Sequence, residues 1–86
     1  MFEIEIKKKA LKYAKKLNKK RKNKLIEMLD ILESNPLPFK KYDLKKLKGY
    51  QDTYRIRIGD IRIVYEINFI KKLIVIHFIG TRGKAY

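Results

Sequence analysis

The chain has 86 residues, of which 45% are hydrophobic, so it is long enough for one small domain with a modest core. It has no cysteine, which excludes disulfides and thiolate metal sites. Lysine and arginine outnumber the acids by 23 to 9, and a net charge of +14 favours a polyanionic partner such as RNA or DNA. No apolar run approaches the roughly 20 residues that span a bilayer, and the acidic N-terminus does not fit a signal peptide, so no membrane association and a cytoplasmic location are expected.

The hydrophobic periodicity predicts a single α+β domain over residues 1–86. Pro36 and Pro38 end the second predicted helix, and the residues from 39 to 49 have the composition of an irregular basic linker. The predicted elements in chain order are a strand at 2–6, helices at 7–17 and about 18–34, and strands at 54–58, 61–65 and 73–79. The helical hairpin is expected to cover one face of a sheet whose last three strands form an antiparallel meander, with the other face left open.

A hairpin centred on Gly59 and Asp60 is the most informative feature, because isoleucine alternates with arginine on both sides of the turn. Its expected register places Arg57 opposite Arg62, with Arg55 on the same face. Like charges directly opposite each other destabilise a sheet. An anion bound there would offset the repulsion, and guanidinium geometry suits phosphate.

The remaining chemistry-bearing residues give weaker signals. Ten lysines and one arginine lie between Lys7 and Lys24 with no acid among them, which favours either long-range attraction to nucleic acid or a solvated helix face. The strand at 73–79 is apolar at nearly every position, so it is expected to be buried on both faces and His77 to pack in the core. No histidine–carboxylate pair is expected for acid/base work, and neither a cofactor nor a metal is called for.

The chain resembles the RelE/ParE toxin superfamily of toxin–antitoxin systems, and its basic residues make it most similar to the RelE branch. The resemblance is carried by Leu47-Lys48-Gly49, by the hairpin, and by Gly80-Thr81-Arg82 followed by Tyr86. It implies the RelE-like fold and a metal-independent endoribonuclease that cuts mRNA in the ribosomal A site and thereby inhibits translation. The catalytic residues implied by position are Arg55, Arg57, Arg62, Arg82 and Tyr86, with further RNA contacts expected from Lys46, Lys48 and Lys84.

The implied reaction is attack of a 2′-hydroxyl on the adjacent phosphate. The arginines would stabilise the developing charge, and Tyr86 is the candidate for activating the hydroxyl. The resemblance also implies a cognate acidic, RelB-like antitoxin and a toxin–antitoxin complex that binds operator DNA. Two alternatives stay open on the same fold, namely a ParE-like toxin that poisons gyrase and a non-catalytic basic RNA-binding protein.

Overall fold

The computed structural model describes residues 1–81, so Arg82, Lys84 and Tyr86 lie outside the described residues. Its elements in chain order are β1 (Glu3–Ile6), α1 (Lys8–Lys15), α2 (Lys19–Ser34), β2 (Asp43–Lys46), β3 (Thr53–Ile58), β4 (Ile61–Asn68) and β5 (Leu73–Thr81). None of the helices among these residues is long and apolar enough to cross a bilayer.

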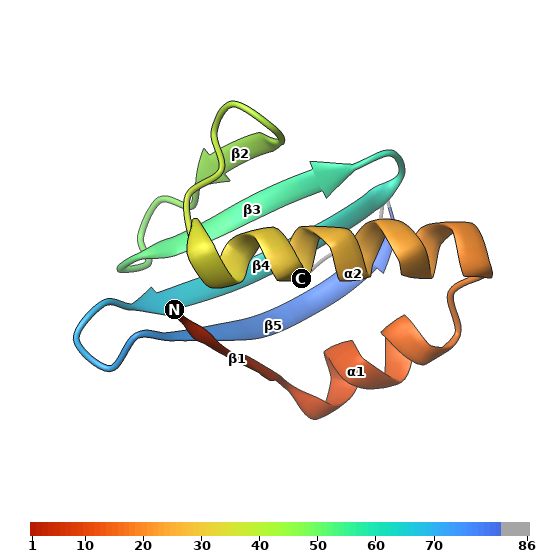
Figure 1. Ribbon diagram of the computed structural model, residues 1–86, viewed down its shortest axis with the longest axis horizontal. Helices are drawn as coiled ribbons and strands as arrows, with labels where there is room; N and C mark the ends of the chain where they lie inside the picture. Colours follow the sequence, from red (N-terminus) through yellow and green to blue (C-terminus); the bar gives the residue numbers. More distant parts are fainter. Residues whose placement is uncertain (82–86) are drawn as a thin grey trace.

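The strands form one sheet in the order β1-β5-β4-β3-β2, with β1 parallel to β5 and the other neighbours antiparallel. In Figure 1 the long helix α2 lies across one face of this sheet. The predicted α+β class and the β3–β4–β5 meander are confirmed. One prediction was wrong, because the supposed linker contains β2, a short edge strand in which Leu44 pairs with Ile56 of β3. Leu44 is the only apolar residue of that strand, so the strand shows no alternation in the sequence.

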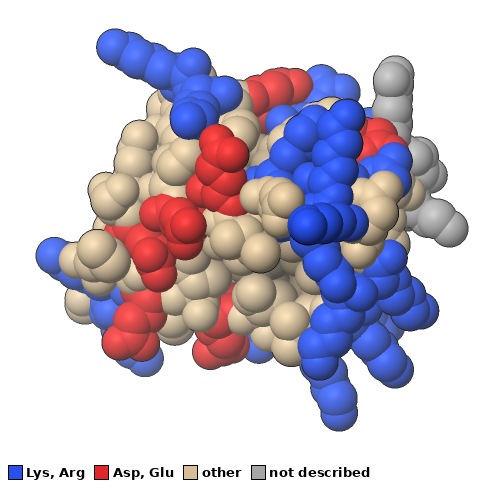
Figure 2. All heavy atoms as spheres, turned by 45° about the vertical axis from the view of Figure 1, so that its right-hand side comes forward, with Lys and Arg blue, Asp and Glu red and all other residues tan. Residues whose placement is uncertain are grey.

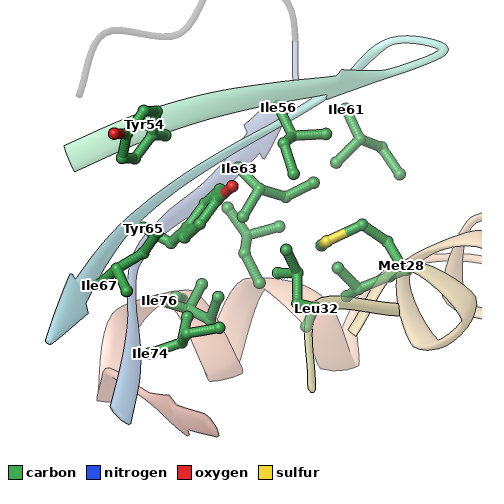
Figure 3. Packing of buried hydrophobic residues seen from close by; sticks show 14 residues of the cluster. Met28, Leu32, Tyr54, Ile56, Ile61, Ile63, Tyr65, Ile67, Ile74 and Ile76 are labelled. Carbon is green, nitrogen blue, oxygen red and sulfur yellow. The ribbon is translucent and has the colours of Figure 1, made fainter. Parts of the chain in front are cut away.

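The core lies between α2 and the inner face of the sheet. Met28 and Leu32 of α2 are fully buried and point toward isoleucines of β3, β4 and β5 (Figure 3). Burying one such side chain stabilises the fold by about 1.5–3 kcal/mol. The largest fully buried side chains are Tyr65, Met28, Leu32, Ile56, Ile61, Ile63, Ile74, Ile76 and Pro38. The opposite sheet face carries the alternating polar residues of β3 and β4, together with apolar side chains such as Val64 and Phe78.

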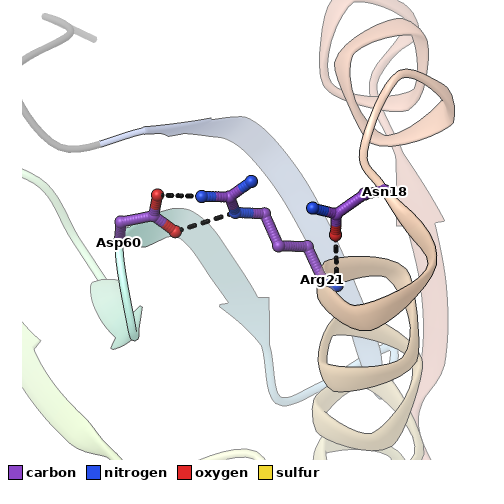
Figure 4. A network of polar contacts seen from close by, with 3 residues as sticks. All are labelled: Asn18, Arg21 and Asp60. Carbon is purple, nitrogen blue, oxygen red and sulfur yellow. Dashed lines mark hydrogen bonds and ion pairs between the residues drawn. The ribbon is translucent and has the colours of Figure 1, made fainter.

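The N-terminus of α2 is joined to the turn between β3 and β4. Asn18 caps the helix by accepting a hydrogen bond from the backbone N–H of Arg21 at 2.9 Å. The guanidinium of Arg21 forms a bidentate ion pair with Asp60 (Figure 4). The pairing lowers the pKa of the Asp60 carboxyl, chiefly through the hydrogen bond from Arg21. Gly59 has a φ of +58°, which suits the first position of a tight hairpin turn. These contacts fix the direction of the hairpin that carries the arginines.

A β-bulge interrupts the pairing of β4 with β5. Val64 pairs with Phe78 and Tyr65 pairs with Ile76, so His77 has no partner in the ladder. The prediction that β5 is buried on both faces was wrong, because Val75 and Phe78 on its outer face are only partly buried and His77 is exposed. The side chain of His77 is 40% exposed and does not pack in the core.

Candidate nucleic-acid interface

Three arginines lie together on the sheet face opposite the helices, and we call them the arginine cluster: Arg55, Arg57 and Arg62. The register predicted for the hairpin is present, with Arg57 directly opposite Arg62 and Arg55 opposite Val64. The alternation that sends the intervening isoleucines into the core places all three guanidinium groups on the open face. The like charges predicted to oppose each other are therefore present in the fold.

A single carboxylate partly offsets this repulsion. Asp43 of β2 accepts a hydrogen bond from Nε of Arg57 at 2.9 Å and one from Nη2 of Arg55 at 3.3 Å. Asp43 lies opposite Arg57 in the ladder, so β2 brings its carboxylate to the edge of the cluster. The sequence pattern did not reveal this acid as part of the site, because residues 39–49 did not look like a strand.

The cluster still contains guanidinium nitrogens whose hydrogen-bonding capacity is not satisfied. Within residues 1–81, Nε of Arg55 and Nε of Arg62 are buried and have no hydrogen-bond partner. The Arg55 side chain is only 13% exposed. A buried donor without a partner costs about 1–3 kcal/mol, and more when it is charged. An anion with several acceptor oxygens would pair with the accessible ends of these guanidinium groups, so the cluster has the chemistry of a phosphate site.

The structure describes two of the predicted RNA-binding lysines, Lys46 and Lys48, and does not place them with the arginine cluster. Lys46 is opposite Tyr54 in the ladder, which puts it on the side of the helices, whereas Lys45 is opposite Arg55 and shares the open face. Lys45 was not among the predicted contacts, and the register of β2 was needed to find it. Lys46 and Lys48 line a shallow hollow of about 590 Å³ next to Tyr50.

Charge is distributed unevenly over the rest of the surface. In the view of Figure 2, most lysine and arginine atoms gather on one side and the acids form a band on the other. The run from Lys7 to Lys24 contributes eight lysines and Arg21 to α1 and the start of α2, and two further lysines that flank α1. Such a one-sided distribution attracts a polyanion over a distance of about one Debye length, roughly 8–10 Å in physiological salt.

An imidazole–carboxylate pair on the open face corrects two predictions. Nε2 of His77 lies 2.9 Å from Oε1 of Glu66, and both side chains are accessible to solvent. The sequence predicted a core histidine and no histidine–carboxylate pair, and both predictions were wrong. Ile76 faces the core, so the next residue, His77, lies on the open face, and the bulge leaves it there without a ladder partner beside Glu66.

The pair forms one wall of a second hollow on the open face, which we call the β4–β5 hollow. Its volume is about 410 Å³, and it is lined mainly by Leu47, Tyr50, Val64, Glu66, His77 and Phe78. The ring of Phe78 lies against Gly80, where an added Cβ would collide with it. Because Gly80 is the ladder partner of Arg62, this ring lies between the hollow and the arginine cluster.

Comparison with known proteins identifies the class as toxins of type II toxin–antitoxin systems. The family model described as the ParE toxin of the type II toxin–antitoxin system parDE matches residues 4–86, and the chain belongs to this family. The chain is also 39% identical, over 85 residues, to the putative toxin RelE1 of Methanocaldococcus jannaschii, a match that covers 99% of this chain and 94% of the relative. The resemblance to RelE/ParE toxins found in the sequence is thereby confirmed.

Two solved structures extend the similarity to three dimensions. The archaeal RelE–RelB complex from Pyrococcus horikoshii OT3 contains a chain with 37% sequence identity and a TM-score of 0.87, and the match covers 98% of both chains. The RelB–RelE complex from Methanococcus jannaschii gives 32% identity and a TM-score of 0.71, covering 91% of this chain and 89% of its counterpart. The chain is thus a RelE-type toxin in sequence and in fold.

Proposed function

We propose that this protein is a ribosome-dependent endoribonuclease that cuts mRNA in the ribosomal A site and so inhibits translation. The observation that carries the proposal is the arginine cluster with its two buried and unsatisfied Nε atoms, on the sheet face opposite α2. A fold gains nothing from opposed arginines and unpaired donors. Phosphate oxygens of an RNA backbone would offset the repulsion between the arginines and accept hydrogen bonds from their accessible guanidinium N–H groups.

The reaction proposed for this site is attack of a 2′-hydroxyl on the adjacent phosphate. The attack forms a 2′,3′-cyclic phosphate as the bond from phosphorus to the 5′-oxygen breaks, and the 2′-hydroxyl gives up a proton while the leaving 5′-oxygen gains one. The arginine cluster would stabilise the charge that develops on the phosphoryl oxygens, and removal of one such donor typically reduces the rate 10²–10³-fold. Arginine stays protonated and does not act as a base. Proton transfer therefore falls to other groups, of which Tyr86 is the proposed activator of the hydroxyl. We propose no metal or cofactor for this step.

The ribosome would supply the alignment of the reacting atoms, which the protein does not provide by itself. Binding in the A site would hold the mRNA with the hydroxyl, phosphorus and leaving oxygen in line. Alignment of this kind contributes about 7–11 kcal/mol to lowering a barrier. Cleavage of free RNA is therefore expected to be feeble, and cleavage on programmed ribosomes to be strong.

We further propose that an acidic, RelB-like antitoxin holds the protein inactive in the cytoplasm and that their complex binds operator DNA. Two observations support an antitoxin partner. The solved relatives from Pyrococcus horikoshii and Methanococcus jannaschii are RelE–RelB complexes. The net charge of +14 also strongly favours an acidic partner, which would relieve the self-repulsion of the free protein.

The test compares mRNA-programmed ribosomes with naked mRNA and maps the ends of the products. Wild-type protein should give codon-phased cuts on ribosomes only. Arg62→Gln should cut 10²–10³-fold more slowly, since it removes one donor from the cluster. Lys71→Gln, in the exposed turn between β4 and β5, removes the same charge outside the arginine cluster and should cut like the wild type. Equal cutting of both substrates, or equal rates for the two variants, would contradict the proposal.

A second candidate is a toxin that poisons gyrase, because the description of the matching family model names the ParE toxin. Induced expression separates the two functions. Accumulated DNA breaks with intact mRNA would favour the gyrase poison. Codon-phased mRNA ends with intact DNA would favour the endoribonuclease, and salt-sensitive RNA binding without either effect would favour a non-catalytic RNA-binding protein.

A further inference from the structure

The β4–β5 hollow adjoins the arginine cluster but has a different chemistry. Val64 lines the hollow and is the ladder partner of Arg55, and neighbouring strands lie only about 4.8 Å apart. Along β4, Glu66 lies four residues from Arg62, which corresponds to about 13 Å of strand. A polyanion bound at the arginines therefore extends directly over a cavity that is not itself basic.

The lining of the hollow suits a flat aromatic ligand. Leu47, Val64 and Phe78 give it apolar walls, and Tyr50 at its rim is 66% exposed. A volume of about 410 Å³ falls within the range of small-molecule sites, about 300–1,000 Å³. Bases of single-stranded RNA bind proteins chiefly by stacking on side chains of this kind.

The carboxylate of Glu66 is the unusual part of the hollow. A negative group on the face of the arginine cluster repels phosphate, so this end of the face does not serve the RNA backbone. The hydrogen bond to His77 uses Oε1, which leaves Oε2 available as a second acceptor on a residue that lines the hollow. Both side chains are about half exposed, and a pair of this kind adds little to stability. Its placement therefore calls for an explanation in terms of binding.

We propose that the β4–β5 hollow binds one nucleobase of the RNA and prefers a base with an exocyclic amino group. Glu66 would accept a hydrogen bond from that amino group, as carboxylates do from N4 of cytosine, while Tyr50 stacks on the ring. A comparison of cytosine with uracil tests this most directly, because uracil has the same size and presents a carbonyl oxygen in place of the amino group. The inference rests on the proposed function only in taking RNA as the ligand.

The first experiment measures binding without any cleavage. Short oligocytidylate and oligouridylate of equal length carry equal charge, so their affinities for the purified full-length protein differ only through the bases. Wild-type protein should bind oligocytidylate about tenfold more tightly. Glu66→Gln should bring that ratio close to one. Glu3→Gln makes the same change on the exposed edge strand β1 and should leave the ratio unchanged.

Tyr50 provides an independent variant. Tyr50→Ala should weaken the binding of both oligonucleotides about tenfold while preserving the preference for cytosine, because stacking does not depend on the base. Tyr50→Phe should restore the affinity. Circular dichroism and urea unfolding of each variant establish that the fold is intact. A wild-type ratio near one, or a Glu66→Gln variant that keeps the tenfold preference, would overturn the proposal.

The second experiment repeats the comparison on programmed ribosomes with codons that differ by cytosine or uracil. Wild-type protein should cut a larger share of the cytosine codons at one codon position, and Glu66→Gln should lose this bias. Cleavage without any cytosine bias, together with a binding ratio near one, would refute the base site and leave the endoribonuclease standing. Cytosine-selective binding without any cleavage would refute the endoribonuclease and support the base site.

Discussion

Replacing Asp43 by asparagine should strengthen RNA binding, although it removes an ion pair. The Asp43 carboxylate binds Nε of Arg57 at 2.9 Å and Nη2 of Arg55 at 3.3 Å. It thus occupies the guanidinium donors that a phosphate would use, and its charge opposes that of the phosphate. Asparagine has nearly the same shape and no charge, so the variant isolates the electrostatic effect.

The magnitude follows from the charge removed. For single-stranded nucleic acid, the logarithm of affinity falls with the logarithm of salt concentration with a slope of about −0.7 per phosphate neutralised. Asp43→Asn adds one unit to the effective charge of the cluster, so the slope should steepen by about 0.7. Extrapolated to 0.1 M salt, this corresponds to about fivefold tighter binding.

The same substitution should have a small effect on stability. The Asp43 side chain is 53% exposed and that of Arg57 is 40% exposed. Ion pairs at such positions contribute about 0–1 kcal/mol, because water and salt screen them. The free energy of unfolding should therefore fall by no more than about 1 kcal/mol while RNA affinity rises.

The assay is fluorescence anisotropy of a labelled short RNA, titrated between about 50 and 200 mM salt. Asp30→Asn on α2 is the matched control, since it removes one exposed negative charge on the helix side of the sheet. Its effect should be smaller because of screening over about 10 Å at 0.1 M salt. If the two variants bind RNA equally, or if the slope for Asp43→Asn is unchanged, the arginine cluster is not the phosphate site.

Three further predictions concern the scaffold of the interface. Gly80→Ala should destabilise the fold by about 1–3 kcal/mol in urea unfolding, because the new methyl group meets the ring of Phe78; an unchanged midpoint would contradict this packing. Tyr65→Phe should cost about 1 kcal/mol, since the buried hydroxyl donates to a backbone carbonyl at 2.8 Å; a loss below a few tenths would show that this bond is not needed. The pKa of Asp60 is lowered by Arg21, so the pair contributes stability above the unfolded carboxyl pKa of about 3.9 and loses it as pH falls through the lower folded pKa. Urea midpoints should thus fall more steeply with acid for the wild type than for Asp60→Asn, and parallel curves would contradict the pairing.

The hairpin could be predicted from the sequence because its signals are local. Alternation of isoleucine with arginine sets the faces, and Gly59 with Asp60 sets the turn, so the opposition of Arg57 and Arg62 follows from the sequence. The start of α2 is similarly local, since Asn18 is a strong capping residue ahead of an apolar stripe. These elements depend little on what packs against them.

The parts of the interface that could not be predicted depend on tertiary pairing. Asp43 reaches the arginine cluster only because β2 pairs with β3, and three charged residues around Leu44 conceal that strand. His77 stands in a run of apolar residues, and periodicity does not reveal where a single unpaired residue will fall. Asp43 and His77 could therefore be assigned to the open face only from the structure.

The bulge at His77 also affects how readily the chain can change over evolutionary time. Ile74 and Ile76 face the core before the bulge and Ile79 faces it afterwards, so the spacing between core residues is two and then three. If the codon for His77 were deleted, Ile76 and Phe78 would become consecutive. All the remaining side chains of β5 would stay on the sheet face that they now occupy. One codon gained or lost thus adds or removes the imidazole without a compensating change in the core.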